Sequence, residues 1–259
     1  MTTCGIVLGC MDGRAQGLEE KLKKDWHVDK VDTITRAGAV GIIIKENSGT
    51  GTSSDKFGYE DICRHIEISI NDHDSTHLAV VGHADCAGHP VLDDDQKNYI
   101  NSAVEILSKK YHLKVNGIWI GRENLMPERA TFGTVVTFMD GGFLEPLQDK
   151  LTKEWDVAVV DTITRAGAVG IIIRANTDTT DNPDIIAYED ICWHIEISLK
   201  KHESKHLAIA GHRVSDAAQK DIIRAAKILS IRFCLPVEGY RFGEDFTPIK
   251  IYPSTEVNG

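Results

Sequence analysis

Short apolar runs and segments of helical spacing alternate along the first half of the chain. Apolar runs bounded by glycine or polar residues predict buried strands, at residues 5–9, 30–34, 78–81 and 115–120. Apolar positions at helical spacing predict helices, at residues 18–24, 59–70 and 102–111. Strands that alternate with helices indicate an α/β fold with a parallel sheet.

The same pattern occurs twice, because the chain repeats itself at a spacing of 129 residues. Residues 31–44 and residues 160–173 both read VDTITRAGAVGIII. Solenoid repeats are only about 20–50 residues long, so this spacing indicates a duplicated domain. We therefore expect two tandem units, residues 1–125 and residues 131–259, on either side of a polar segment.

Composition excludes several classes of protein. The 259 residues include 29 Lys and Arg against 39 Asp and Glu, a formal net charge of −10. Because nucleic acids attract basic surfaces, we expect no nucleic-acid partner. No apolar run reaches the roughly 18–20 residues of a membrane helix, and the N-terminal segment does not resemble a signal peptide. We therefore expect a cytoplasmic protein whose six cysteines are reduced thiols or metal ligands.

Soft metal ligands follow two of the predicted strands. Cys10 comes directly after the run at 5–9, and His83 and Cys86 follow the run at 78–81. Ligands of open parallel sheets bind beyond the carboxyl ends of strands, so the three side chains converge if these strands are neighbours. Two thiolates and one imidazole are typical of Zn²⁺. Three protein ligands leave a fourth position for water or for Asp12, as in catalytic zinc sites.

Two motifs give the first half a resemblance to a known family. C-x-D-x-R at Cys10–Arg14 and H-x-x-C at His83–Cys86, each after a strand, resemble the β-class carbonic anhydrases, in particular their short archaeal-type members. The resemblance implies that Cys10, His83 and Cys86 bind Zn²⁺ and that the enzyme hydrates carbon dioxide reversibly to bicarbonate. It also implies catalytic roles for two further residues. Arg14 orients the carboxylate of Asp12, which faces the zinc-bound water or becomes the fourth ligand.

The second half is expected to lack a metal site. Aligning residues 133–142 with residues 5–14 puts Phe138 in place of the first cysteine, and the repeat spacing puts Ser215 in place of the second. Only His212 matches a ligand, and one imidazole is not expected to hold zinc. The homodimers of the resembled family imply that the two halves pair as an intramolecular pseudo-dimer with one active site. A homodimer of the whole chain would then form a four-unit assembly.

Other interpretations stay open at this point. The three ligands could form a structural zinc site or be separate buried residues, and Asp12 and Arg14 could form an ordinary surface salt bridge. Relatives of the same fold hydrolyse carbon disulfide or carbonyl sulfide, and a non-catalytic zinc scaffold or bicarbonate sensor is a further alternative. The glycine-rich segment 49–58 lacks the phosphate-loop motif, so no nucleotide cofactor is expected.

Repeated residues outside the site are expected to be structural. Cys63 and Cys192 lie on apolar helix faces, which predicts that both belong to the core. Arg36 and Arg165 occur in the identical block of both halves, which favours a structural role over a catalytic one, although Arg36 could still line the pocket. His89 follows the second cysteine and precedes a proline, and we expect it in a solvated loop.

Overall fold

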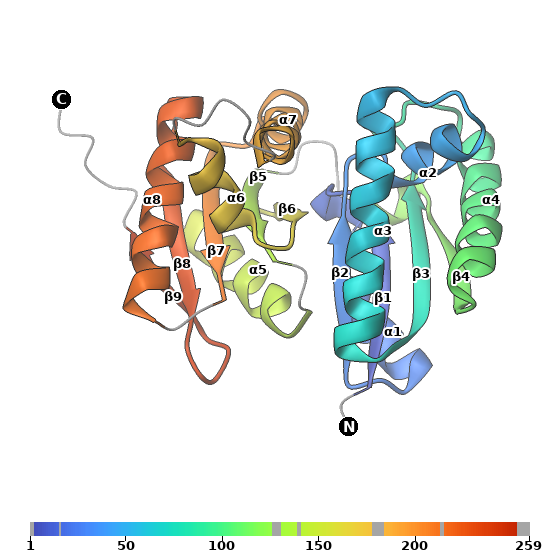
Figure 1. The fold of residues 1–259 in the computed structure, drawn as a ribbon, viewed down its shortest axis with the longest axis horizontal. Coiled ribbons are helices and arrows are strands. Elements are labelled where there is room, and N and C mark those ends of the chain that lie inside the picture. Colours follow the sequence, from blue (N-terminus) through green and yellow to red (C-terminus); the bar gives the residue numbers. More distant parts are fainter. Residues whose placement is uncertain are drawn as a thin grey trace. The chain divides into compact units, whose positions relative to one another are not determined.

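The computed structural model describes residues 3–15, 17–125, 131–138, 141–177, 184–212 and 215–252. The chain divides into two compact units: the first comprises residues 1–128 and 139–142, and the second comprises residues 129–138 and 143–259. Each unit has its own sheet with helices packed on it (Figure 1). The predicted α/β class and the two tandem sheet units are therefore confirmed.

The first unit is built on four parallel strands in the order β2-β1-β3-β4. The strands are β1 (Cys4–Gly9), β2 (Lys30–Thr35), β3 (Ser75–His83) and β4 (Lys114–Ile120). The helices are α1 (Glu19–Trp26), α2 (Ala39–Asn47), α3 (Ser53–His73) and α4 (Asp93–Tyr111), with the 3-10 turns η1 (Gly13–Ala15) and η2 (Arg122–Asn124).

Two helices of this unit differ from the sequence prediction. The sequence did not predict α2, because residues 39–43 are all buried and show no polar face. A helix buried on all sides lacks the amphipathic spacing by which helices are recognised. Helix α4 begins at Asp93 rather than at residue 102. Its first turn contains three aspartates, which stabilise a helix N-terminus but leave no apolar stripe there.

Alternation along the strands divides the core of the first unit between the two faces of its sheet. Ile6 and Leu8 of β1 pack with residues of α2, α3 and α4. Val7 belongs to a separate cluster that contains Leu22 of α1. Figure 1 shows α3 lying along the first of these faces. Because β1 is buried on both faces, it reads as a continuous apolar run. It is the strand that positions Cys10.

The second unit repeats this topology and adds an edge strand. The sheet order is β6-β5-β7-β8-β9, with only β9 antiparallel to its neighbour. The strands are β5 (Phe132–Thr137), β6 (Val159–Thr164), β7 (His206–Gly211), β8 (Val237–Phe242) and β9 (Pro248–Tyr252). The helices are α5 (Gly141–Trp155), α6 (Ala168–Ala175), α7 (Asp184–Lys201) and α8 (Asp216–Phe233). No helix in the described part of the chain is both long and apolar enough to span a membrane.

A buried carboxylate ties β2 to the end of α3. Asp32 is fully buried and accepts hydrogen bonds from the Ser69 hydroxyl and from Nδ1 of His73. The second unit has the same arrangement at Asp161, Ser198 and His202. Repetition of this network in both units indicates that it stabilises the fold.

The Asp32 network can be tested by substitution. We expect Asp32→Ala to lower the free energy of unfolding by about 3 kcal/mol, because it leaves buried donors without an acceptor. Urea-induced unfolding followed by circular dichroism measures the change. Asp72→Ala, which removes an exposed carboxylate beside His73, should change stability by less than about 0.5 kcal/mol. Equal effects of the two substitutions would contradict the structural role of Asp32.

Candidate metal centre

Parallel pairing of β1 with β3 brings the predicted ligands to one edge of the sheet. Leu8 lies opposite Val80 in this pair, so the two strands end side by side. Cys10 follows the end of β1, and His83 is the last residue of β3. The strand order reverses between these two strands, and such a switch point is where open α/β sheets bind their ligands.

Cys10, His83 and Cys86 form one buried cluster at this edge. Their ligand atoms all lie within 4.8 Å of one another, and the two sulfurs are 3.8 Å apart. Two sulfurs bound at 2.3 Å to a tetrahedral zinc ion are also about 3.8 Å apart. A disulfide bond would need about 2.05 Å. The structure therefore brings together all three side chains predicted as ligands, at a spacing that fits a shared zinc ion.

A hydrogen bond to the backbone orients the imidazole of His83. Its Nδ1 donates a hydrogen bond to the carbonyl oxygen of Ala84 at 2.7 Å. Its buried Nε2 has no hydrogen-bond partner among the described residues. Metal-binding histidines are commonly held in this way, with one ring nitrogen bonded to the backbone and the other directed at the metal. A buried nitrogen without a partner is costly, and a metal ion would satisfy it.

The charges of the cluster favour a cation. A hydrogen bond from Cys86 lowers the pKa of Cys10 well below its usual value, so this thiolate is stabilised. Burial alone would lower the pKa of His83, but the Cys10 thiolate and the Asp12 carboxylate raise the pKa of His83 to about 9. The negative charge at the cluster thus attracts protons, and zinc binding would replace them.

Asp12 and Arg14 form a tight ion pair beside the cluster. Oδ1 of Asp12 accepts from the backbone N and from Nε of Arg14, both at 3.0 Å, and Oδ2 accepts from Nη2 at 2.6 Å. The side chain of Asp12 is 2% exposed and that of Arg14 is 8% exposed. A bidentate guanidinium fixes the direction of a carboxylate and keeps it ionised. The site therefore presents an oriented acceptor close to the three ligands.

Several contacts hold the metal loop, which we define as residues 84–92 and which contains Cys86. The backbone N–H of Ala84 donates to the Ile120 carbonyl oxygen at 3.0 Å, and Asp85 forms an ion pair with Arg122. Within the loop, the N–H of residue 89 donates to the Cys86 carbonyl oxygen at 3.1 Å. The loop is therefore tied to the end of β4 as well as to β3.

His89 lies in this loop but is buried, so the prediction of a solvated histidine is wrong. Its Nδ1 donates to Oε1 of Gln96 on α4 at 2.8 Å, and Gln96 is buried too. The ring lies against Gly41 of α2, where a β-carbon would come within 2.5 Å of Cγ of His89. The missing side chain at Gly41 makes room for the ring. Glycine within the apolar AVGIII run was the signal in the sequence.

The second unit lacks the two thiolates. Gly5 packs against Trp26 and Gly133 packs against Trp155 in the same manner, so the strands align as the sequence alignment assumed. This alignment places Phe138 where the first unit has Cys10. The ring of Phe138 contacts the imidazole of His212, with centroids 5.1 Å apart. Aromatic packing thus occupies the position of the first thiolate.

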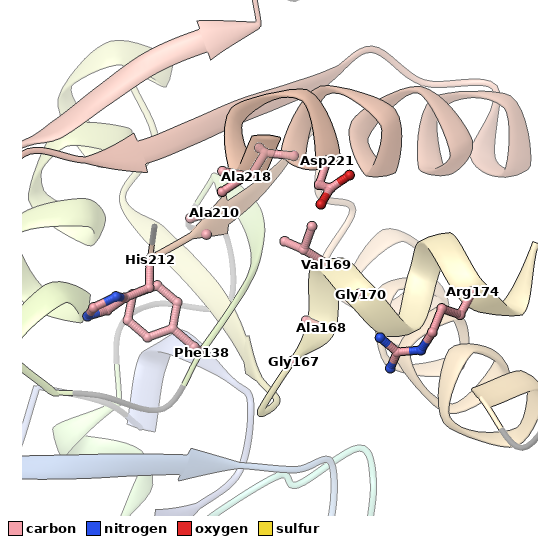
Figure 2. Close-up of a pocket in the computed structure, with 12 residues that line it drawn as sticks. Phe138, Gly167, Ala168, Val169, Gly170, Arg174, Ala210, His212, Ala218 and Asp221 are labelled. Atoms are coloured by element: carbon pink, nitrogen blue, oxygen red, sulfur yellow. The ribbon is translucent and has the colours of Figure 1, made fainter. Parts of the chain in front are cut away.

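Ser215 does not occupy the position of the second cysteine. It is the N-cap of α8, and its hydroxyl accepts from the backbone N–H of Ala218. The chain between β7 and α8 is shorter than the metal loop, so the 129-residue spacing no longer applies there. A cavity of about 500 Å³ lies at this end of the second sheet. Figure 2 shows it between Phe138, His212, Val169 and Ala218.

The repeated residues outside the site are structural, as predicted. Cys63 and Cys192 are buried. Arg36 pairs with Asp61 of α3, and Arg165 pairs with Asp190 of α7 in the same way. The same ion pair occurs in the unit with Cys10 and Cys86 and in the unit without them, which favours a structural role for both arginines.

A second group of potential ligands lies at the amino end of β1. Cys4, Asp32 and His73 offer ligand atoms within 4.8 Å of one another. The carboxylate and the imidazole are already hydrogen-bonded to each other, and the second unit keeps that bond with Phe132 stacked on His202. We therefore interpret Asp32 and His73 as part of a structural network that lies next to the buried thiol of Cys4.

Comparison with known families agrees with this duplication. No curated protein and no solved structure matches the chain. One family profile, described as "Putative carbonic anhydrase", matches the chain twice, at residues 1–127 and at residues 128–237. The two matches together cover most of the chain, including the first sheet and strands β5, β6 and β7 of the second. The chain therefore belongs to this carbonic anhydrase family, with one copy of the family domain in each half.

Proposed function

We propose that the protein is a zinc-dependent carbonic anhydrase that hydrates carbon dioxide reversibly to bicarbonate, at one site per chain in the first unit. The observation that carries the proposal is the buried cluster at the end of β1 and β3. Its two sulfurs are 3.8 Å apart, and it contains a buried imidazole nitrogen without a hydrogen-bond partner in the described chain. Membership of a carbonic anhydrase family supports the choice of reaction.

Each residue of the cluster has a distinct task in this proposal. Cys10, His83 and Cys86 would hold Zn²⁺, which when bound supplies a Lewis acid that makes hydroxide available at neutral pH. Asp12 would accept a hydrogen bond from the attacking oxygen. This bond would direct a lone pair of that oxygen toward the carbon of carbon dioxide. Arg14 donates hydrogen bonds to both oxygens of Asp12, which holds the carboxylate in place. The proton released from water leaves to solvent.

The proposal extends to the setting of the enzyme. The chain would act in the cytoplasm, its two halves pairing as a pseudo-dimer and two chains forming a four-unit assembly. Fusion of two copies would replace a concentration-dependent association by an intramolecular one. The second unit would then supply stability rather than a second site.

Zinc content tests the number of sites. We expect one zinc ion per chain in protein purified with zinc, because only the first unit has the two cysteines. Elemental analysis after dialysis measures the ratio. Cys86→Ala should lose the metal, whereas His212→Ala in the second unit should keep it. Two ions per chain, or loss of zinc from His212→Ala, would contradict a single site in the first unit.

Carbon dioxide hydration followed by stopped flow tests the reaction. We expect a rate far above that of buffer for the zinc-loaded protein. Asp12→Ala should lower kcat/KM by about 10²-fold or more, because a positioned hydrogen-bonding group is lost, while one zinc per chain remains. His212→Ala serves as the control and should keep full activity. A zinc-loaded protein without hydration activity would refute the proposal, and turnover of carbon disulfide or carbonyl sulfide would then identify the substrate.

A further inference from the structure

We propose that His89 and Gln96 are positioning residues that clamp the metal loop, so that Cys86 is held at the metal centre. This inference rests on the proposed zinc site, and it assigns a role to two residues outside the ligand set. The side chains of both residues lie outside the ligand set. Both would act through the backbone of the loop.

The clamp consists of contacts that residues 88 and 89 of the loop make with α2 and α4. Nδ1 of His89 donates to Oε1 of Gln96 at 2.8 Å. The imidazole lies against Gly41 and packs on the ring of Tyr99, with centroids 5.3 Å apart. Next to it, Gly88 lies so close to Gly38 that a β-carbon on either glycine would overlap the backbone of the other segment. The loop therefore packs directly on α2, with no space for a side chain at Gly38, Gly41 or Gly88.

A short backbone path connects the clamp to the ligand. The N–H of His89 donates to the carbonyl oxygen of Cys86 at 3.1 Å, which closes a tight turn between the two residues. A shift of the imidazole would therefore move the carbonyl, and with it the thiolate. A metal site tolerates errors of only a few tenths of an ångström in its ligand distances. The position of the His89 ring therefore affects the position of the Cys86 thiolate at the site.

The second unit shows which residues disappear together with the metal ligands. Packing against Gly82 and Gly211 aligns Ile100 of α4 with Ile222 of α8. This alignment places Ala218 at Gln96 and Asp221 at Tyr99, and the shorter connection has no counterpart of His89.

The second unit keeps the two glycines of the identical block, although the loop that they accommodate in the first unit is shorter there. Gly167 and Gly170 remain in the identical block, and among the described residues no atom lies within 4 Å of a β-carbon built on Gly167. The cavity of about 500 Å³ is lined by these glycines and by Ala218 and Asp221 (Figure 2). The second unit has neither the clamp residues nor the two cysteines, which supports a link between the clamp and the metal site.

The duplication supplies a matched pair of variants. Gly41→Ala and Gly170→Ala make the same change at the same position of an identical helix sequence. In Gly41→Ala the new methyl group meets the His89 ring, whereas in Gly170→Ala it meets only the flexible end of Arg174, at 2.7 Å. We expect Gly41→Ala to weaken zinc affinity by about tenfold or more, as losses of supporting residues do. Gly170→Ala should leave the affinity unchanged. Competition with a chelator measures both.

Direct variants of the clamp refine the test. His89→Ala and Gln96→Ala should weaken zinc affinity by about 10–100-fold and alter the thiolate-to-metal absorption band of the Co²⁺-substituted protein. His89→Asn keeps a donor near the position of Nδ1 and should restore part of the affinity. The melting temperature of the metal-free protein serves as the control for folding. Wild-type affinity and an unchanged cobalt spectrum in His89→Ala would overturn the proposal.

A metal-independent readout separates this inference from the proposed function. In the metal-free protein, Gly41→Ala and His89→Ala should raise the rate at which iodoacetamide alkylates Cys86, since the loop is no longer seated. Cys63 provides an internal reference thiol in the same unit. Unchanged alkylation of Cys86 would overturn the clamp. Faster alkylation in a protein whose wild type binds no zinc would support the clamp and refute the zinc enzyme.

Discussion

Parallel pairing of β1 with β3 is the constraint on which the candidate site depends. Only this pairing places the residue after one strand next to the last residue of another that lies far away in the sequence. The carboxyl ends of parallel strands share one edge, and the helices cover both faces, so side chains at that edge enter a dry, low-dielectric environment. There a thiolate and an imidazole are costly unless they are paired with each other or with a metal ion.

The two halves show that the same framework supports two different outcomes at this edge. Both units keep the strand order, the buried carboxylate between sheet and helix, and the arginine–aspartate ion pair of the identical block. In the first unit the edge contains two thiols, an imidazole and a seated loop. In the second, Phe138 packs on His212, the loop is short and a cavity remains. The fold does not require the two cysteines at this edge, since the second unit forms without them.

Much of this arrangement could be predicted from the sequence. The apolar runs located the strands, and the cysteines and the histidine that follow them are the three side chains that the structure brings together. The buried helix α2 was missed because a helix without a polar face has no helical periodicity. His89 was misjudged because its burial depends on Gly41, which is distant in sequence. Ser215 was misplaced because a constant repeat spacing cannot register a deletion inside a loop. These errors concern contacts between distant segments, which local patterns do not encode.

The central claim is that one metal ion is held by two thiolates and one imidazole in the first unit. X-ray absorption at the zinc edge of the loaded protein tests it most directly. The account predicts two sulfur ligands at about 2.3 Å and one nitrogen ligand at about 2.0 Å, with one remaining oxygen ligand. Loss of one sulfur from the spectrum of the Cys10→Ser variant would complete the assignment. A first shell without sulfur, or with four sulfurs, would contradict it.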